Sequence, residues 1–358
     1  MNKDTYIARI NKAKKLAEDK NIDGLWITKP ENKYYLSGFE SSNFFIYLTK
    51  ERNYLLTDFR YIELARSLET GFETVMLTNQ YTALDFLREN CPGTLGIEYK
   101  SITFDFYNDM MEKVKPGNIV SADQIIESIR IIKEKQEIDA VKSAAEIANL
   151  AFVHILDFIK PGVTERDIAL ELEFFMRHKG ADALAFDTIA ASGERGSLPH
   201  AVPSSRALKN GDFVTLDFGA KWNGYCSDMT RTVGLGAISA EQKNVYRIVL
   251  EAQKAASAVI AANVSASVAD SVAREMISGA GYGEYFGHGL GHGVGLEIHE
   301  APTLNALSKD VLKTDMTVTI EPGIYIPGKF GVRIEDLAVV TDNGIISLST
   351  VDKELIII

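Results

Sequence analysis

The sequence contains the same short pattern twice, and each copy carries an acidic residue at the same position. Residues 208–219 read LKNGDFVTLDFG and residues 312–323 read LKTDMTVTIEPG. The two copies align without a gap at an offset of 104 residues (312 − 208), which sets Asp217 against Glu321. Two copies are too few for a solenoid, so the pattern predicts one domain built from two related halves that face each other. Matching acids in the two halves predict a site assembled from both.

The segments before each copy match as well. An H-x-x-P motif occurs as HAVP at residues 200–203 and as HEAP at residues 299–302, an offset of 99 residues (299 − 200). Further upstream, Thr164 and Ser265 each resemble the N-cap of a helix, at an offset of 101 residues (265 − 164). Each half is therefore predicted to contain two helices followed by antiparallel strands.

A further domain is predicted before the repeat. A chain of 358 residues exceeds the size at which one hydrophobic core keeps growing. Alternating strand-like and helix-like runs predict an α/β domain at residues 1–125, and a long helix at residues 128–159 leads into a second domain at residues 126–358. The predicted strands of the first domain are residues 24–28, 44–49, 53–58, 73–77 and 94–98, with a last strand within 115–124 and helices near 59–69 and 80–90.

Charge and apolar patterning argue against several classes of partner. The formal net charge is −11, whereas surfaces that bind nucleic acid or anionic membranes are basic. The N-terminal sequence lacks the apolar segment of a signal peptide, and no apolar run reaches the roughly 18 residues of a membrane span. The two cysteines, Cys91 and Cys226, form neither a disulfide framework nor a zinc motif. We therefore predict a cytoplasmic protein with no nucleic-acid and no membrane partner.

The alternation of side chains in the repeated strands places the acids on a buried face. In the first copy, FVTLDF sets Thr215 and Asp217 on one face and aliphatic residues on the other. In the second copy, TVTIEP does the same with Thr319 and Glu321. Several carboxylates buried together would cost many kcal/mol unless cations neutralise them.

Further acids and histidines complete a set of metal ligands. Asp228 and Glu335 follow the two copies, so four negative charges match two divalent cations. The segment at residues 287–300, GHGLGHGVGLEIHE, contains three histidines, His288, His292 and His299. Taken alone, this segment also fits a close-packed turn, and it lacks a phosphate-binding glycine pattern. Together with the acids it supplies a nitrogen ligand and imidazoles around it.

The mixture of ligands indicates both the metal and the reaction. Carboxylates with imidazole suit Mn²⁺, Co²⁺, Zn²⁺ or Fe²⁺ better than Ca²⁺ or Mg²⁺. Two such ions about 3.5–4 Å apart turn a bridging water into hydroxide near neutral pH. The pattern therefore predicts hydrolysis at a carbonyl. Arg333 lies two residues before Glu335 and either fixes an acid of the site or makes a purely structural ion pair.

These motifs resemble a known family. TLDFGA, SDMTRT, HGLGHGVGLEIHE, TIEPGIY and VRIED are similar to segments of the "pita-bread" metallopeptidases, and the resemblance covers residues 128–358. It implies an α+β pita-bread (creatinase/aminopeptidase) fold with a pseudo-twofold internal repeat. It implies as metal ligands Asp217, Asp228, His292, Glu321 and Glu335, with Asp228 and Glu335 bridging two ions. It implies as catalytic residues His200, His288 and His299 on the substrate side, Glu321 as a proton carrier, and Arg333 beside Tyr325.

The first domain decides between branches of that family. Methionine aminopeptidases generally lack such a domain, and ENKYYLSGF at residues 31–39 resembles a segment of the Xaa-Pro branch. Creatinase shares the fold but not the full set of ligands. The resemblance thus implies a Xaa-Pro aminopeptidase with two divalent ions, Mn²⁺ first, acting on short peptides with proline second through a metal-bridging hydroxide.

Two alternatives stay open at this point. A Xaa-Pro dipeptidase (prolidase) would have the same site. A non-catalytic binding protein on the same fold would be expected to have lost ligands, and this chain keeps all five. A homodimer is implied by resemblance.

Overall fold

The computed structural model describes residues 3–68, 70–91 and 93–358. The chain forms two compact units, Met1–Arg130 and Ile131–Ile358. The division falls five residues after the boundary predicted between residues 125 and 126 (130 − 125). Within the described part of the chain, no helix combines the length and the apolar character needed to cross a lipid bilayer.

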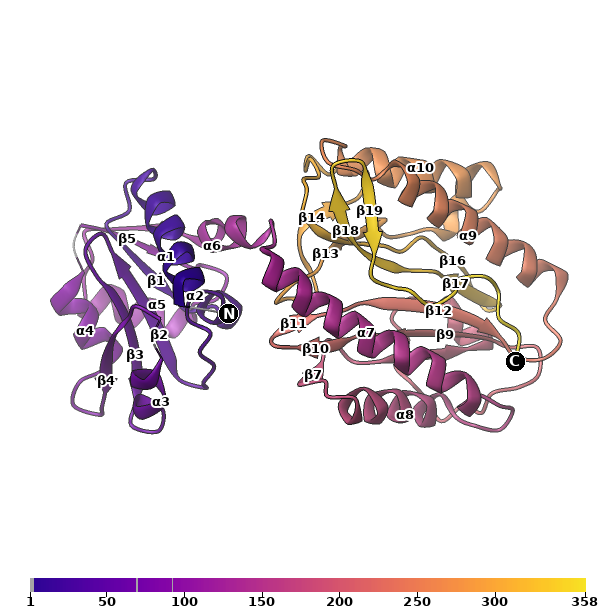
Figure 1. The fold of residues 1–358 in the computed structure, drawn as a ribbon, viewed down its shortest axis with the longest axis horizontal. Coiled ribbons are helices and arrows are strands. Elements are labelled where there is room, and N and C mark those ends of the chain that lie inside the picture. The colour runs from indigo at the N-terminus through magenta and orange to yellow at the C-terminus, as the bar shows by residue number, and fades with distance from the viewer. Residues whose placement is uncertain (1–2, 69, 92) are drawn as a thin grey trace. The chain divides into compact units, whose positions relative to one another are not determined.

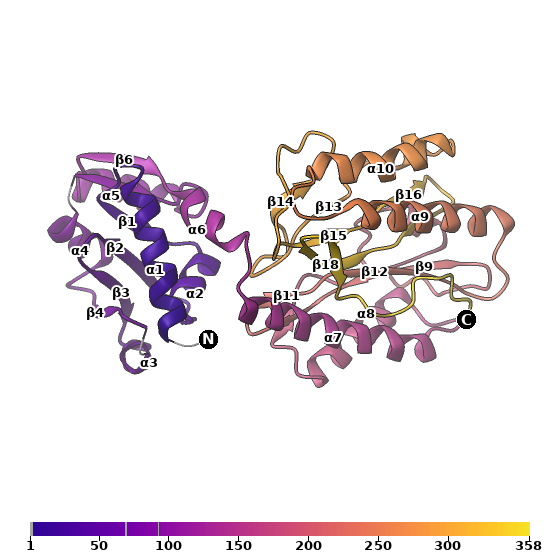
Figure 2. The same cartoon turned by 45° about the horizontal axis from the view of Figure 1, so that its top comes forward.

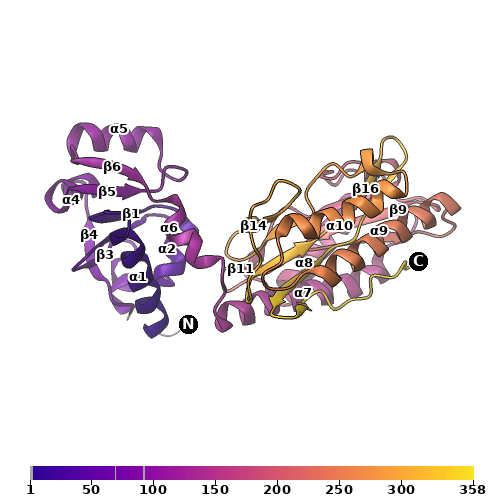
Figure 3. The same cartoon turned by 90° about the horizontal axis from the view of Figure 1, so that it is seen from above.

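The first unit is an α/β domain around a six-stranded sheet of order β4-β3-β2-β1-β5-β6. Strand β2 runs antiparallel to β1 and β3, and the remaining pairs are parallel. Helices α1, α2 and α6 pack together, as do α4 and α5, and the two groups lie on opposite faces of the sheet (Figure 3). The strands are β1 (Gly24–Ile27), β2 (Phe44–Thr49), β3 (Asn53–Asp58), β4 (Glu73–Leu77), β5 (Thr94–Ile97) and β6 (Asn118–Ser121). The helices are α1 (Lys3–Glu18), α2 (Pro30–Ser37), α3 (Ile62–Ser67), α4 (Ala83–Asn90), α5 (Phe104–Lys113) and α6 (Asp123–Arg130).

The long helix predicted at residues 128–159 is wrong, because the chain breaks there. Helix α6 ends at Arg130 and α7 (Lys135–Phe158) begins five residues later (135 − 130). Glu134 has extended backbone angles (φ −74°, ψ 159°), and its N–H donates to the Glu137 carboxylate at 2.9 Å. This bond satisfies a backbone donor that helix geometry leaves free, so it marks a helix start inside a charged run.

The second unit contains two halves in which two helices precede antiparallel strands, as predicted. In Figures 1 and 2 the strands lie between the helix pair α7–α8 and the helix pair α9–α10. The first half comprises α7, α8 (Glu165–His178), β7 (Ala183–Leu184), β8 (Ile189–Ser192), the 3₁₀ turn η1 (Gly193–Ser197), β9 (Phe213–Phe218), β10 (Ala220–Trp222), β11 (Tyr225–Cys226) and β12 (Met229–Gly234). The second comprises α9 (Ala240–Val259), α10 (Ala266–Gly279), η2 (Gly283–Tyr285), β13 (Gly291–Gly293), β14 (Glu300–Leu304), β15 (Thr317–Ile320), β16 (Gly323–Ile326), β17 (Phe330–Arg333), β18 (Asp336–Thr341) and β19 (Gly344–Ser347).

The internal repeat is visible in the backbone pairing of the two cap residues. Thr164 forms an isolated antiparallel bridge with Ala207, and Ser265 forms one with Val311. Each partner is the residue immediately before one copy of the repeated pattern. The start of the second helix in each half is therefore fixed to the start of the strand that carries an acid.

The two halves bury their aliphatic residues in separate cores, which leaves the acids facing the middle. Val214 and Leu216 of β9 pack with α7 and α8 in the first core. Val318 and Ile320 of β15 pack with α9 and α10 in the second. The predicted alternation along both strands is confirmed, since these four residues belong to the aliphatic cores whereas Asp217 and Glu321 line the cavity.

Candidate metal centre and substrate cavity

The five residues predicted as metal ligands come from five places along the chain and line one cavity of about 570 Å³. Asp217 lies near the end of β9, Asp228 between β11 and β12, His292 in the middle of β13, Glu321 directly after β15, and Glu335 between β17 and β18. Residues 118 positions apart (335 − 217) thus meet in one place.

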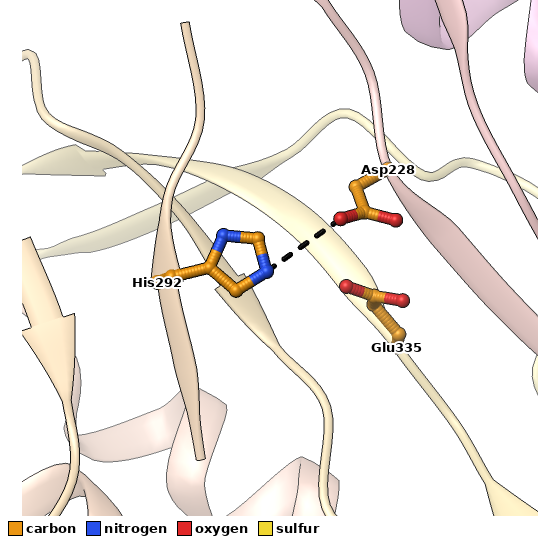
Figure 4. Close-up of side chains that lie close together, drawn as sticks. All are labelled: Asp228, His292 and Glu335. Carbon is orange, nitrogen blue, oxygen red and sulfur yellow. Dashed lines mark ion pairs between the residues drawn. The ribbon is translucent and has the colours of Figure 1, made fainter. Parts of the chain in front are cut away.

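Three of these residues offer ligand atoms that lie within 4.8 Å of one another, namely Asp228, His292 and Glu335 (Figure 4). The His292 ring points toward both carboxylates. Its Nε2 lies 3.6 Å from Asp228 Oδ2 and 3.4 Å from Glu321 Oε1. This spacing leaves room for a cation between imidazole and carboxylate.

Two buried carboxylate oxygens of the cluster are suited to binding a cation. Asp217 Oδ1 and Glu335 Oε1 are enclosed and have no hydrogen-bond partner among the described residues. Their sister oxygens are engaged, Asp217 Oδ2 by Arg333 and Glu335 Oε2 by Thr230. An enclosed carboxylate oxygen without a partner costs free energy that a bound cation would offset.

The pKa values of the acids reflect the crowding of negative charge. Burial, followed by repulsion from Glu335, raises the pKa of Asp228 well above its ordinary value. Burial and repulsion from Glu321 do the same to the pKa of Glu335. Burial also acts to raise the pKa of Glu321, but its hydrogen bond to His292 and the positive charges around it outweigh burial and lower this pKa. The cluster is thus an environment that attracts divalent cations.

Arg333 pairs with Asp217, an acid of the first half, rather than with Glu335, which lies two residues away in the sequence. It is 3% exposed, and its Nη2 lies 2.5 Å from Asp217 Oδ2. Its Nε donates to Thr230 Oγ1 at 2.9 Å, and Thr230 Oγ1 donates to Glu335 Oε2 at 2.7 Å. Of the two roles that the sequence left open for Arg333, the geometry supports fixing an acid of the site.

His288 lines the cavity but has both ring nitrogens engaged inside the protein. Nδ1 lies 2.8 Å from the Gly289 carbonyl oxygen, which only accepts, so Nδ1 carries the proton. Burial lowers the pKa of His288, so the ring is neutral and its Nε2 accepts from the Tyr325 hydroxyl at 2.9 Å. Arg333 Nη1 in turn donates to Tyr325 Oη at 2.9 Å. A direct contact of His288 with substrate, as predicted, would require this chain of bonds to open.

The remaining predicted histidines, His200 and His299, are exposed and line the same cavity. The ring centroids of His299 and His292 lie 4.4 Å apart, and the interplanar angle is 68°. Burial and the nearby His292 lower the pKa of His299. The structure thus gathers all nine predicted site residues around one cavity. They are His200, Asp217, Asp228, His288, His292, His299, Glu321, Arg333 and Glu335.

Several residues that shape the site were missed from the sequence. Phe186, Asp187 and Ile189 line the cavity from the segment that leads into β8. Ile189 pairs with Asp217 across the β8–β9 ladder, but no motif marks it. Thr230, the partner of Glu335, is contained in SDMTRT and could have been singled out by its spacing from Asp228.

The chain belongs to metallopeptidase family M24, whose model matches residues 139–342. Residues 9–132 match the creatinase/prolidase N-terminal domain. The chain is therefore a metallopeptidase with the two-part pita-bread architecture, and divalent metal ions are implied by the family.

The chain is similar along nearly its whole length to proteins named as Xaa-Pro dipeptidases or X-Pro aminopeptidases. It is 40% identical over 350 residues to a Xaa-Pro dipeptidase of Pyrococcus furiosus, covering 97% of this chain and 99% of the relative. The solved structure of a Xaa-Pro dipeptidase from Bacillus anthracis superposes with a TM-score of 0.96 at 42% identity, covering 99% of this chain and 100% of the other. The structure of an X-Pro aminopeptidase from Thermotoga maritima gives a TM-score of 0.89 at 36% identity, covering 98% and 99%.

Proposed function

We propose that this chain is a two-metal Xaa-Pro peptidase that hydrolyses the bond between a first residue and a following proline. The observation that supports it best is the enclosed cluster of four carboxylates and one imidazole, in which two carboxylate oxygens lack hydrogen-bond partners among the described residues. We propose two divalent ions, Mn²⁺ first and Co²⁺, Zn²⁺ or Fe²⁺ as alternatives, held by Asp217, Asp228, His292, Glu321 and Glu335. When bound, such ions supply Lewis acidity that activates water and polarises the scissile carbonyl.

The protein groups around the proposed ligands fix their orientation. The Arg333 guanidinium holds Asp217, and Thr230 holds Glu335. The backbone N–H of His292 donates to Thr319 Oγ1 at 3.0 Å, which fixes the strand that presents the imidazole. Because Arg333 acts through Asp217, we assign it as a positioning residue. Such supporting contacts keep ligands in place for binding.

The exposed histidines and Glu321 are suited to handling the peptide. We propose that His200 and His299 donate hydrogen bonds to substrate carbonyl oxygens. Glu321 lies within 3.4 Å of His292 Nε2, and its lowered pKa keeps it ionised. It can therefore accept a proton from water and deliver it to the leaving proline nitrogen.

Two substrate lengths remain as candidates, a dipeptide and a longer peptide. A dipeptidase is favoured by the relatives named Xaa-Pro dipeptidase, which match this chain from end to end. An aminopeptidase acting on longer peptides is favoured by the charges of the cavity. Among its described lining residues Arg333 is the only arginine or lysine, and its guanidinium is committed to Asp217 and Tyr325. The carboxylate of a dipeptide would then find no uncommitted arginine or lysine among the described lining residues.

Product analysis separates these candidates. The chain is freed of metal, loaded with Mn²⁺ and given Leu-Pro and Leu-Pro-Ala in parallel. Release of leucine from either peptide only when Mn²⁺ is present supports the proposed peptidase, and the ratio of the two rates decides the preferred length. No Mn²⁺-dependent cleavage of either peptide would contradict the proposal. The homodimer and the cytoplasmic location stay predictions.

A further inference from the structure

One buried carboxylate of the first half holds both ends of the segment that carries His200. Glu165, the first residue of α8, is 0% exposed. Its Oε1 accepts from the Ser192 N–H and from Ser192 Oγ, both at 2.8 Å. Its Oε2 accepts from the Ser204 N–H at 3.0 Å and from Ser204 Oγ at 2.6 Å. Residues 192–204 are thereby closed into a loop, and His200 lies within it.

Further contacts of the same loop show that its shape is fixed. Arg195 Nε donates to Glu165 Oε2 at 2.9 Å, and Arg195 Nη2 donates to the Val202 carbonyl oxygen at 2.6 Å. A Cβ atom on Gly196 would lie 3.1 Å from the backbone nitrogen of Gly331, so the loop backbone runs tightly against β17. The loop is therefore held on both sides of His200, at Arg195 and Gly196 before it and at Val202 and Ser204 after it.

The second half has a buried carboxylate with a corresponding task, one helical turn further along. Asp270 of α10 is 0% exposed, and its Oδ1 accepts from the Leu290 N–H at 3.0 Å. Both of its oxygens pair with Arg274 at 2.8 Å. Arg274 donates onward to the carbonyl oxygens of Phe286 at 3.1 Å and His288 at 2.8 Å. This pair thus holds the segment that carries His288.

The two carboxylates do not occupy equivalent positions of the repeat. At the offset of the helix caps, 101 residues (265 − 164), Glu165 corresponds to Ala266 and Asp270 corresponds to Ala169. Each half therefore has an acid where the other has a buried alanine. The two acids are thus not one repeated position, and each holds a segment of its own half.

We propose that Glu165 and Asp270 are positioning residues, which set His200 and His288 respectively at the cavity for the reaction. The inference rests on the proposed function and adds residues that touch neither metal nor substrate. A buried carboxylate that accepts several hydrogen bonds orders the donors around it, because leaving any of them unpaired is costly. Displacing a group at a reacting centre by about 1 Å costs up to a hundredfold in rate.

Double-mutant cycles on kcat/KM test this assignment. The substitutions are E165Q, D270N, H200A and H288A in the Mn²⁺-loaded chain, assayed with Leu-Pro and Leu-Pro-Ala. We expect E165Q alone to lower kcat/KM about tenfold, and to have less than twofold further effect once H200A is present. D270N should show the same dependence on H288A, whereas E165Q with H288A and D270N with H200A should be additive.

Controls separate positioning from loss of folding. Bound Mn²⁺ and the thermal midpoint are measured for every variant, and S204A removes only part of the Glu165 contacts should E165Q fail to fold. S204A should then show the same dependence on H200A with a smaller loss. Additivity of E165Q with H200A, or wild-type kcat/KM in E165Q, would overturn the proposal for Glu165, and the matching results would do so for Asp270. Failure of the unmodified chain to cleave either peptide would instead contradict the proposed function.

Discussion

The two halves of the second unit share a scaffold but differ in what they bring to the cavity. The first half supplies two of the proposed ligands, Asp217 and Asp228, and the second supplies His292, Glu321 and Glu335. The aliphatic faces of their strands are buried alike in two separate cores. The comparison teaches that the duplicated part places strands and one acid of each half, Asp217 and Glu321, at matching positions, whereas the proposed imidazole ligand His292 comes from the second half.

The largest effect is expected from removing one acid of either half. Asp228→Ala and Glu335→Ala should each lower kcat/KM by more than about a hundredfold, because losing a ligand costs more than losing a supporting contact. Metal content measured by mass spectrometry should fall below that of the unmodified chain in both. As a control, Asp157→Ala changes an exposed acid of α7 outside the cavity. Full metal content in either ligand variant would show that the ligands of one half suffice to bind the metal.

Arg333 tests the connection between the halves, since it belongs to the second and holds an acid of the first. Arg333→Met leaves the mostly buried Asp217 without its cation, which should destabilise the metal-free chain by about 3–5 kcal/mol. We expect kcat/KM to fall about 10- to 100-fold. Arg333→Lys keeps the charge but not the forked geometry, so its loss should be intermediate. Urea unfolding and kinetics measure both, and a Met variant as active as the Lys variant would contradict a role for the charge.

The buried acid of the first half should give a pH-dependent contribution to stability. Burial acts to raise the pKa of Glu165, but its hydrogen bonds to Ser204 and Ser192 outweigh burial and lower this pKa. A lowered folded-state pKa adds stability above the ordinary carboxyl pKa, and this stability is lost as the pH falls through the lowered value. Glu165→Gln should therefore cost about 1–3 kcal/mol at neutral pH. The cost should shrink on acidification in urea unfolding, and a cost that grows on acidification would show the sign to be wrong.

The smallest effect concerns the two helix caps. Thr164 Oγ1 accepts from the Asp167 N–H at 3.1 Å, and Asp167 accepts from the Thr164 N–H at 3.1 Å. Ser265 makes no side-chain cap bond and pairs with Ser267 Oγ instead. Thr164→Ala should cost about 1 kcal/mol of unfolding free energy and Ser265→Ala clearly less. Equal decreases in stability of the two variants, measured by thermal unfolding, would mean that the caps do not distinguish the halves.

Much of the scaffold and the candidate ligand set could be predicted because they depend on local patterns. The alternation follows from six consecutive residues in each copy of the pattern, FVTLDF and TVTIEP, and the acids stand at the same position in both. The six strands predicted in the first unit were found for the same reason. The break between α6 and α7 was missed because residues 131–134 have ordinary helix-forming composition and the capping acid Glu137 looks like one more surface charge.

The supporting contacts could not be predicted, because they depend on segments that meet only in the folded chain. Glu165 directly follows the predicted helix cap Thr164, where an acid is favourable without being buried. Its burial results from the loop at residues 192–204 folding back over it. His288 read as a substrate-side imidazole, and only the fold shows that Tyr325 and Gly289 occupy its nitrogens.

The distribution of the proposed ligands along the chain has a consequence for biosynthesis. A chain leaving the ribosome has Asp217 and Asp228 long before it has His292, Glu321 and Glu335. Domains form as units from the N-terminus onward, so the first half emerges with only two of five ligands. The full set of proposed ligands is therefore complete only once Glu335 has been synthesised, and a product truncated before that residue would lack at least one of them.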